Sequence, residues 1–137
     1  MTFNYVAGVQ TFVADLRKHG VRTAIVTSSN RQKMEKVHRA HPELTTLFDA
    51  ILTAEDFTQS KPHPECYLMG ARQIGTIVAE CVGFEDSFNG LKAVRAAGMT
   101  AVGLATTNSR EAIAPFADVV INDFCRLSYA DVCRMIQ

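Results

Sequence analysis

The sequence lacks a long apolar run, a net charge and a pair of cysteines at metal-binding spacing. A helix that spans a membrane needs roughly 20 consecutive apolar residues, so we expect no membrane association. Fourteen basic residues balance fourteen acidic ones, which argues against a nucleic-acid-binding protein. No Cys-x-x-Cys occurs, so we expect buried thiols rather than a zinc site or disulfides at Cys66, Cys81, Cys125 and Cys133.

The start of the chain has no basic flank followed by a long apolar region, so we expect no secretion signal and a cytoplasmic location. The chain of 137 residues has 47% hydrophobic and 20% charged residues, which is ordinary for a globular protein. This length fits one domain over residues 1–137.

Short apolar runs with β-branched residues alternate with segments of helical periodicity. This order predicts an α/β fold, Rossmann-like, with a mostly parallel sheet and helices on both faces. Ser128 and Asp131 have the spacing of a capping box, which predicts the start of the last helix. The expected strands are 23–26, 48–53, 80–83, 100–104 and 118–121, and the expected helices are 9–16, 32–40, 65–74, 88–97, 109–114 and the segment from 128.

Three polar clusters follow expected strands, at residues 27–30, 60–62 and 85–86. Ligands of parallel α/β proteins bind where strands end, so we expect the three clusters to share one site.

Glu85 and Asp86 are adjacent carboxylates between a strand and a helix. Their mutual repulsion is relieved by a cation, and Mg²⁺ commonly takes one or two protein carboxylates together with phosphate and water. The alternative is that Asp86 or Ser87 only caps the helix that follows.

Lys61 lies in a loop stiffened by Pro62 and Pro64, so its ammonium is expected at a fixed position that suits a phosphate. The alternative is a solvated surface lysine.

Thr27 ends a strand, and the helix after it can direct hydroxyl and N–H donors at an anion. The alternative there is a helix cap. Taken together, the three clusters indicate a phosphoryl-transfer site.

These segments resemble motifs two, three and four of the haloacid dehalogenase-like (HAD) superfamily, and most closely the β-phosphoglucomutase-like phosphatases. The resemblance covers nearly the whole chain, and the segment around Glu85 and Asp86 is its most specific part. The segments that carry it are Thr27 after 24–26, the run 60–64, the run 83–87 with Gly90, and the run 96–99.

The resemblance implies that the Thr27 hydroxyl and the Ser28 N–H bind the transferring phosphoryl group, while Lys61 neutralises its charge. It also implies an Mg²⁺ cofactor and a cis bond between Lys61 and Pro62. The acidic pair favours phosphate esters over haloacids as substrates. The remaining residues assigned are Asp86 and Glu85 for Mg²⁺, and Ser29 and Asn30 for substrate contacts.

The sequence departs from the family in one large respect. Family members begin with a strand that ends in Asp-x-Asp, whose first carboxylate takes the phosphoryl group and whose second acts as general acid and base, and a helical cap follows. The chain has no Asp-x-Asp, and Asp118 and Asp123 do not form one. We therefore expect an incomplete HAD core, the C-terminal part of a larger phosphatase, that is inactive alone.

The missing strand corresponds to the middle of the family's sheet. Because exposed strand edges tend to pair with other strands, we expect self-association or a complementing N-terminal segment.

The leading hypothesis is an Mg²⁺-dependent phosphatase or phosphomutase that acts on a small phosphorylated metabolite such as a sugar phosphate. The alternative is a non-catalytic binding or interaction module that retains the HAD fold. A nucleotide-binding domain of another family is disfavoured, since residues 27–30 contain no glycine. In relatives the cap selects the substrate, so the sequence identifies neither the substrate nor the choice between mutase and phosphatase.

Overall fold

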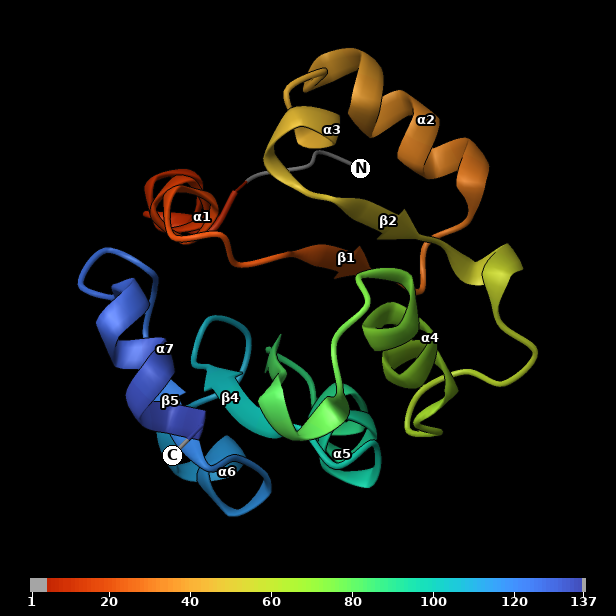
Figure 1. Ribbon diagram of the computed structural model, residues 1–137. Helices are drawn as coiled ribbons and strands as arrows, with labels where there is room; N and C mark the ends of the chain where they lie inside the picture. The colour runs from red at the N-terminus through yellow and green to blue at the C-terminus, as the bar shows by residue number, and fades with distance from the viewer. Residues whose placement is uncertain (1–4, 137) are drawn as a thin grey trace.

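Two separate parallel sheets lie at the centre of the computed structural model, which describes residues 5–136. In Figure 1 the two-stranded sheet lies above the three-stranded one. The pairing is parallel throughout, as predicted. The first sheet pairs β1 (Ala24–Val26) with β2 (Ala50–Leu52), and the second has the order β3 (Val82–Glu85), β4 (Thr100–Leu104), β5 (Val119–Ile121).

Helices connect the strands in the alternating order that the sequence predicts. The main helices are α1 (Val9–Lys18), α2 (Arg31–Ala40), α4 (Glu65–Gln73), α5 (Phe88–Ala96) and α7 (Tyr129–Ile136), with the single turns α3 (Leu44–Leu47) and α6 (Arg110–Ile113). Three 3-10 turns complete the connections: η1 (Ala54–Asp56), η2 (Val78–Glu80) and η3 (Ala114–Phe116).

The third strand begins later than predicted. The sequence predicts this strand at residues 80–83, but Val78–Glu80 form a 3-10 turn and the strand spans Val82–Glu85. The shift matters because Glu85 becomes the last strand residue, and the pleat then sends Gly83 and Glu85 to the same face.

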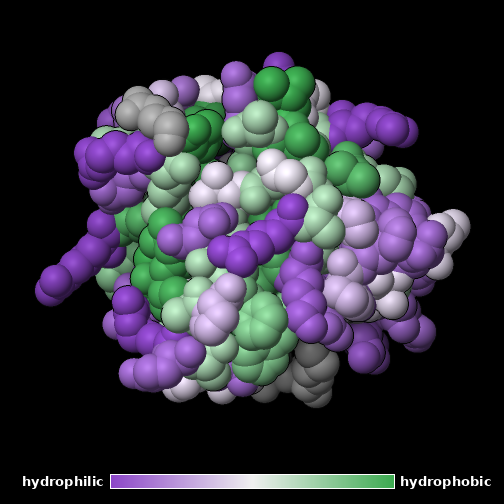
Figure 2. All heavy atoms as spheres, turned by 90° about the horizontal axis from the view of Figure 1, so that it is seen from below, coloured by the Kyte–Doolittle hydropathy of each residue, from purple (hydrophilic) through white to green (hydrophobic). Residues whose placement is uncertain are grey.

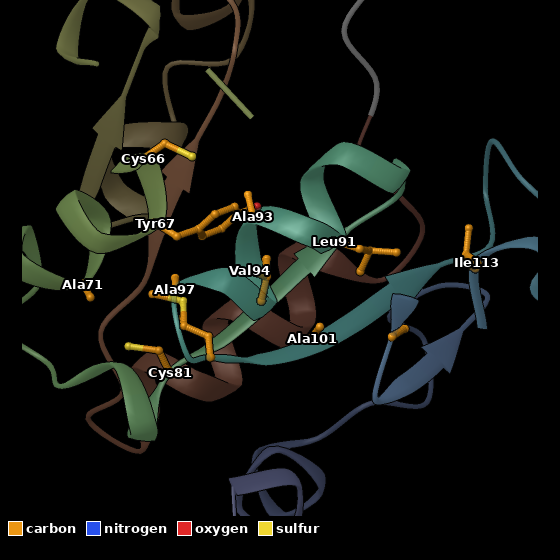
Figure 3. Close-up of a cluster of buried hydrophobic side chains, with 12 residues drawn as sticks. Cys66, Tyr67, Ala71, Cys81, Leu91, Ala93, Val94, Ala97, Ala101 and Ile113 are labelled. Atoms are coloured by element: carbon orange, nitrogen blue, oxygen red, sulfur yellow. The ribbon is translucent and has the colours of Figure 1, made fainter. Parts of the chain in front are cut away.

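The three-stranded sheet is covered on both faces, as predicted. On one face, Gly83 lies so close to α5 that a Cβ there would be 2.6 Å from a methyl carbon of Val94. This face belongs to a buried cluster that includes Tyr67 and Leu91 (Figure 3). On the other face, the ring of Phe84 packs against Phe12 of α1 and Phe124, with ring centroids 5.8 and 5.3 Å apart.

The first and last helices are joined directly. The Asp15 carboxylate of α1 accepts a hydrogen bond of 3.0 Å from the Tyr129 N–H at the start of α7. The His19 ring stacks on the Tyr129 ring at 4.2 Å. The Asp131 carboxylate accepts from the Ser128 N–H at 2.9 Å and the Ser128 hydroxyl accepts from the Asp131 N–H at 3.4 Å, so the predicted capping box is confirmed.

The cysteines are free, but the expectation that they are buried holds only in part. Cys66 and Cys81 are buried, and burial raises the pKa of each thiol. Cys133 is half-buried and Cys125 is exposed, because Cys125 lies in the loop before α7.

Hydrophilic residues are interspersed with hydrophobic ones on the face seen from below (Figure 2). Among the described residues, no helix combines the length and the apolar composition that a membrane span requires.

Candidate active site

Lys61 joins the ends of the two sheets. Its ammonium donates to the Glu85 Oε2 at 2.6 Å, at the end of β3, and to the Val26 carbonyl at 3.3 Å, at the end of β1. The same ammonium lies 5.4 Å from the centre of the Tyr67 ring, a cation–π distance. Its side chain is only 14% exposed, so the alternative of a solvated surface lysine is wrong. The Lys61–Pro62 peptide is cis, as the resemblance implies.

Glu85 is a buried carboxylate held by two donors. Its Oε2 accepts from the Lys61 ammonium and from the Tyr67 hydroxyl. The carboxylate lies on the first turn of α5, where a Cβ at Gly90 would be 2.1 Å from Oε1. Burial, followed by the negative charge of Glu85, raises the pKa of Tyr67, so its hydroxyl keeps its proton and remains a donor.

Asp86 follows Glu85 and is half-buried. The Thr107 hydroxyl donates to Asp86 Oδ2 at 3.0 Å, and the Asn108 amide donates to the Asp86 carbonyl at 3.2 Å. Within residues 5–136, no group donates to Asp86 Oδ1. Helix α5 is capped by the Ser87 hydroxyl, which accepts from the Gly90 N–H at 3.0 Å. The alternative that Asp86 or Ser87 caps this helix is therefore confirmed for Ser87, whereas Asp86 is not the cap.

The loop after β1 presents donors at the strand end. The Thr27 hydroxyl oxygen accepts from the Ser29 N–H at 3.1 Å, which leaves the hydroxyl proton available. The Ser28 N–H has no acceptor in the described part of the chain. Helix α2 is capped by Asn30, whose side chain accepts from the Lys33 N–H at 2.8 Å. Thr27 is therefore not the cap, and the assignment of Ser29 and Asn30 as substrate contacts stays a prediction.

A pocket of about 170 Å³ lies beside this loop. Ser28 and Lys61 both line it, so two of the three predicted phosphate-binding residues border one hollow. The other residues that line it are Ala54, Phe57, Thr58, Gln59, Ser60 and Cys66.

Lys61 therefore lies beside the other two predicted clusters. Its ammonium bonds to Val26, the residue before Thr27, and to Glu85, the residue before Asp86. Sequence reasoning missed Tyr67, Thr107 and Asn108. Thr107 and Asn108 follow a strand, so the same criterion that selected the other clusters could have found them. Tyr67 offers no such signal, because its partner Glu85 lies 18 positions away.

The sequence model of the haloacid dehalogenase-like hydrolases matches residues 6–98. The chain belongs to this family. It is 37% identical over 95 residues to hexitol phosphatase B of Escherichia coli K12, across 69% of this chain and 42% of that protein. It is 31% identical over 132 residues to validoxylamine A 7'-phosphate phosphatase of Streptomyces hygroscopicus, across 93% of this chain and 59% of that protein.

Solved structures of the family superpose closely on this chain. A family IA HAD hydrolase from Entamoeba histolytica has a TM-score of 0.89 at 21% identity, over 96% of this chain and 60% of that one. CbbY from Rhodobacter sphaeroides, solved with phosphate, has a TM-score of 0.83 at 26% identity, over 93% of this chain and 58% of that one. The chain therefore spans little more than half the length of these structures.

Proposed function

We propose that this chain carries the phosphate- and metal-binding half of an Mg²⁺-dependent phosphatase or phosphomutase for small phosphorylated metabolites. The observation that carries the proposal is the position of the Lys61 ammonium, which bonds to the ends of both sheets. A sugar phosphate is the substrate class that the names of relatives favour, since these include hexitol phosphatase B and fructose-1-phosphate phosphatase YqaB.

The chain's own donors define where a phosphoryl group would bind. The available Thr27 hydroxyl proton and the Ser28 N–H are hydrogen-bond donors. Lys61 supplies positive charge at the border of the pocket that Ser28 also lines. Because these groups are held by the fold before an anion arrives, they stabilise its charge without reorganisation.

Asp86 suits a hard cation such as Mg²⁺, because one of its carboxylate oxygens accepts no hydrogen bond from the described residues. Glu85 is less suited in this arrangement, since Lys61 and Tyr67 already share its Oε2. The described residues include no group of three or more His, Cys, Asp or Glu that could hold a metal by themselves. Bound Mg²⁺ would neutralise charge on the phosphoryl oxygens, and further ligands would come from substrate, water or another segment.

The chain alone is proposed to be inactive, because its sequence contains no Asp-x-Asp to attack the phosphoryl group. The open strand edges support complementation by another segment or self-association. In the described sheets β1 pairs only with β2, and β3 pairs only with β4, so each has an unpaired edge. Strand pairing at these edges would shift the NMR signals of their amides, whereas a dilute monomer with cooperative unfolding would count against association.

The phosphate site is tested by titrating inorganic phosphate into the chain and following backbone amide signals. Thr27→Val removes the hydroxyl at nearly constant volume, and we expect it to weaken phosphate binding. Thr45→Val, at an exposed position on α3, is the matched control and should leave binding unchanged. Equal affinity for all three proteins would remove Thr27 from the site.

Turnover is tested with p-nitrophenyl phosphate and Mg²⁺. We expect none from the pure chain, and a rate in the ordinary enzyme range of about 1–10³ s⁻¹ would refute the proposed inactivity.

A non-catalytic module is the second candidate. The missing Asp-x-Asp beside preserved anion donors favours it. It predicts phosphate binding but no turnover even when a strand carrying Asp-x-Asp is fused ahead of α1, whereas the enzyme proposal predicts that such a fusion gains activity.

A further inference from the structure

The loop between β4 and α6 holds Asp86 at two points. Thr107 donates to a carboxylate oxygen of Asp86, and the neighbouring Asn108 donates to its carbonyl oxygen, at 3.0 and 3.2 Å. Two consecutive side chains therefore bind the side chain and the backbone of a single residue. Thr107 is exposed and Asn108 is half-buried, so neither side chain is placed there simply to fill the core.

Both ends of this loop are anchored. The Ala105 N–H donates to the Ile121 carbonyl of β5 at 2.9 Å. At the other end, the Ser109 hydroxyl caps α6 by accepting from the Ala112 N–H at 3.2 Å. Below that cap, Ile113 is fully buried. Thr107 and Asn108 are thus presented from a fixed segment, which limits how far they can follow a movement of Asp86.

We propose that Thr107 and Asn108 are positioning residues that fix Asp86 and thereby set the affinity of the chain for a divalent cation. The inference rests on the proposed function, in which Asp86 binds Mg²⁺. Thr107 occupies Oδ2 and leaves Oδ1 without a donor among the described residues. Hydrogen bonds of this kind restrict a metal-binding carboxylate to one orientation, and removing them commonly weakens metal affinity about 10- to 100-fold.

A purely structural role is the competing explanation, in which the two residues only tie the loop to β3. That role predicts a change in unfolding without a change in cation affinity. The two explanations therefore differ in a measurement that does not require turnover.

The test uses Mn²⁺ as a paramagnetic probe of the full 137-residue chain. Mn²⁺ broadens the amide signals of residues close to it, so even weak binding can be located and titrated. Thr107→Val removes the hydroxyl, Thr107→Ser retains it, and Asn108→Ala removes the second contact. Thr106→Val is the matched control, because Thr106 is exposed in the same loop and makes no hydrogen bond to the described residues. Asp86→Asn reports whether the site itself exists.

We expect Mn²⁺ to broaden signals around residues 85–87 and 107–108 of the wild type, and Asp86→Asn to abolish this effect. Thr107→Val should weaken the apparent affinity about tenfold. Asn108→Ala should weaken the affinity less, because it removes only the hydrogen bond to the Asp86 backbone carbonyl. Thr107→Ser and Thr106→Val should have affinities close to that of the wild type.

Two outcomes would overturn the inference in different ways. If Asp86→Asn abolishes the broadening but Thr107→Val and Asn108→Ala bind as the wild type does, the positioning role is refuted and the metal assignment stands. If the wild type shows no localised broadening, or Asp86→Asn retains it, the metal assignment of the proposed function fails, and the positioning role fails with it.

Discussion

Gly90→Ala should destabilise the protein, although alanine normally favours a helix. Gly90 lies in the first turn of α5, where its backbone conformation suits any residue, and the propensity gain would be at most about 1 kcal/mol. The added methyl carbon, however, would lie 2.1 Å from Oε1 and 2.2 Å from Cδ of Glu85. No Cβ can occupy that position unless the carboxylate moves.

Moving the carboxylate is costly because Lys61 and Tyr67 hold it in a buried place. Disrupting a buried ion pair typically costs about 3–5 kcal/mol. With the propensity gain subtracted, we expect Gly90→Ala to lower the free energy of unfolding by about 2–4 kcal/mol. Urea unfolding followed by circular dichroism would measure it, and Asn89→Ala, at the exposed neighbouring position, is the control expected to stay within about 0.5 kcal/mol.

A double-mutant cycle with Glu85→Ala tests the stated cause. Without the Glu85 carboxylate the clash is absent, so adding Gly90→Ala should then be neutral or slightly stabilising. A loss of the same size in both backgrounds would refute the contact as the reason. So would a Gly90→Ala single variant that is as stable as the wild type.

Three further predictions concern stability. Tyr67→Phe removes a donor to the buried Glu85 and should cost roughly 1–3 kcal/mol in urea unfolding, whereas Tyr129→Phe should cost less. Asp15→Ala removes the acceptor for the Tyr129 N–H and should cost about 0.5–2 kcal/mol; an equal effect of Glu35→Ala, at an exposed position, would exclude this reason. Hydrogen bonds from the backbone and hydroxyl of Thr58 lower the pKa of Glu65, so the stability it contributes is full above the ordinary carboxyl pKa and is lost as the pH falls through the lowered value. Glu65→Gln should therefore be less stable than the wild type near neutral pH and converge with it once the pH has fallen below the lowered pKa of Glu65, and a constant difference in stability across this range would contradict the assignment.

Local sequence signals predicted much of the fold. The strand at 100–104 and the helix start at Ser128 were placed correctly, because β-branched runs and capping residues act over a few neighbouring positions. The third strand was misplaced because Val78–Glu80 form a turn that the apolar pattern does not distinguish from a strand start. The local patterns alone could not show that the five described strands form two sheets, since pairing depends on which segments meet in space. The resemblance predicts the gap between the two sheets, because it places the missing strand in the middle of the sheet.

The candidate site likewise has features that local sequence signals predict and features that depend on tertiary contacts. The sequence by itself determined that Thr27, Lys61 and Asp86 follow strands or lie in a stiff loop, because turn and strand signals are local. Only the tertiary structure decided that the Lys61 ammonium meets the buried Glu85 carboxylate, that Tyr67 shares it, and that Gly90 makes room for it. The contacts of Lys61 and Tyr67 with Glu85 join residues 24 and 18 positions apart in the chain. Their energies arise from burial and charge pairing, which exist only once the helices have packed on the strands.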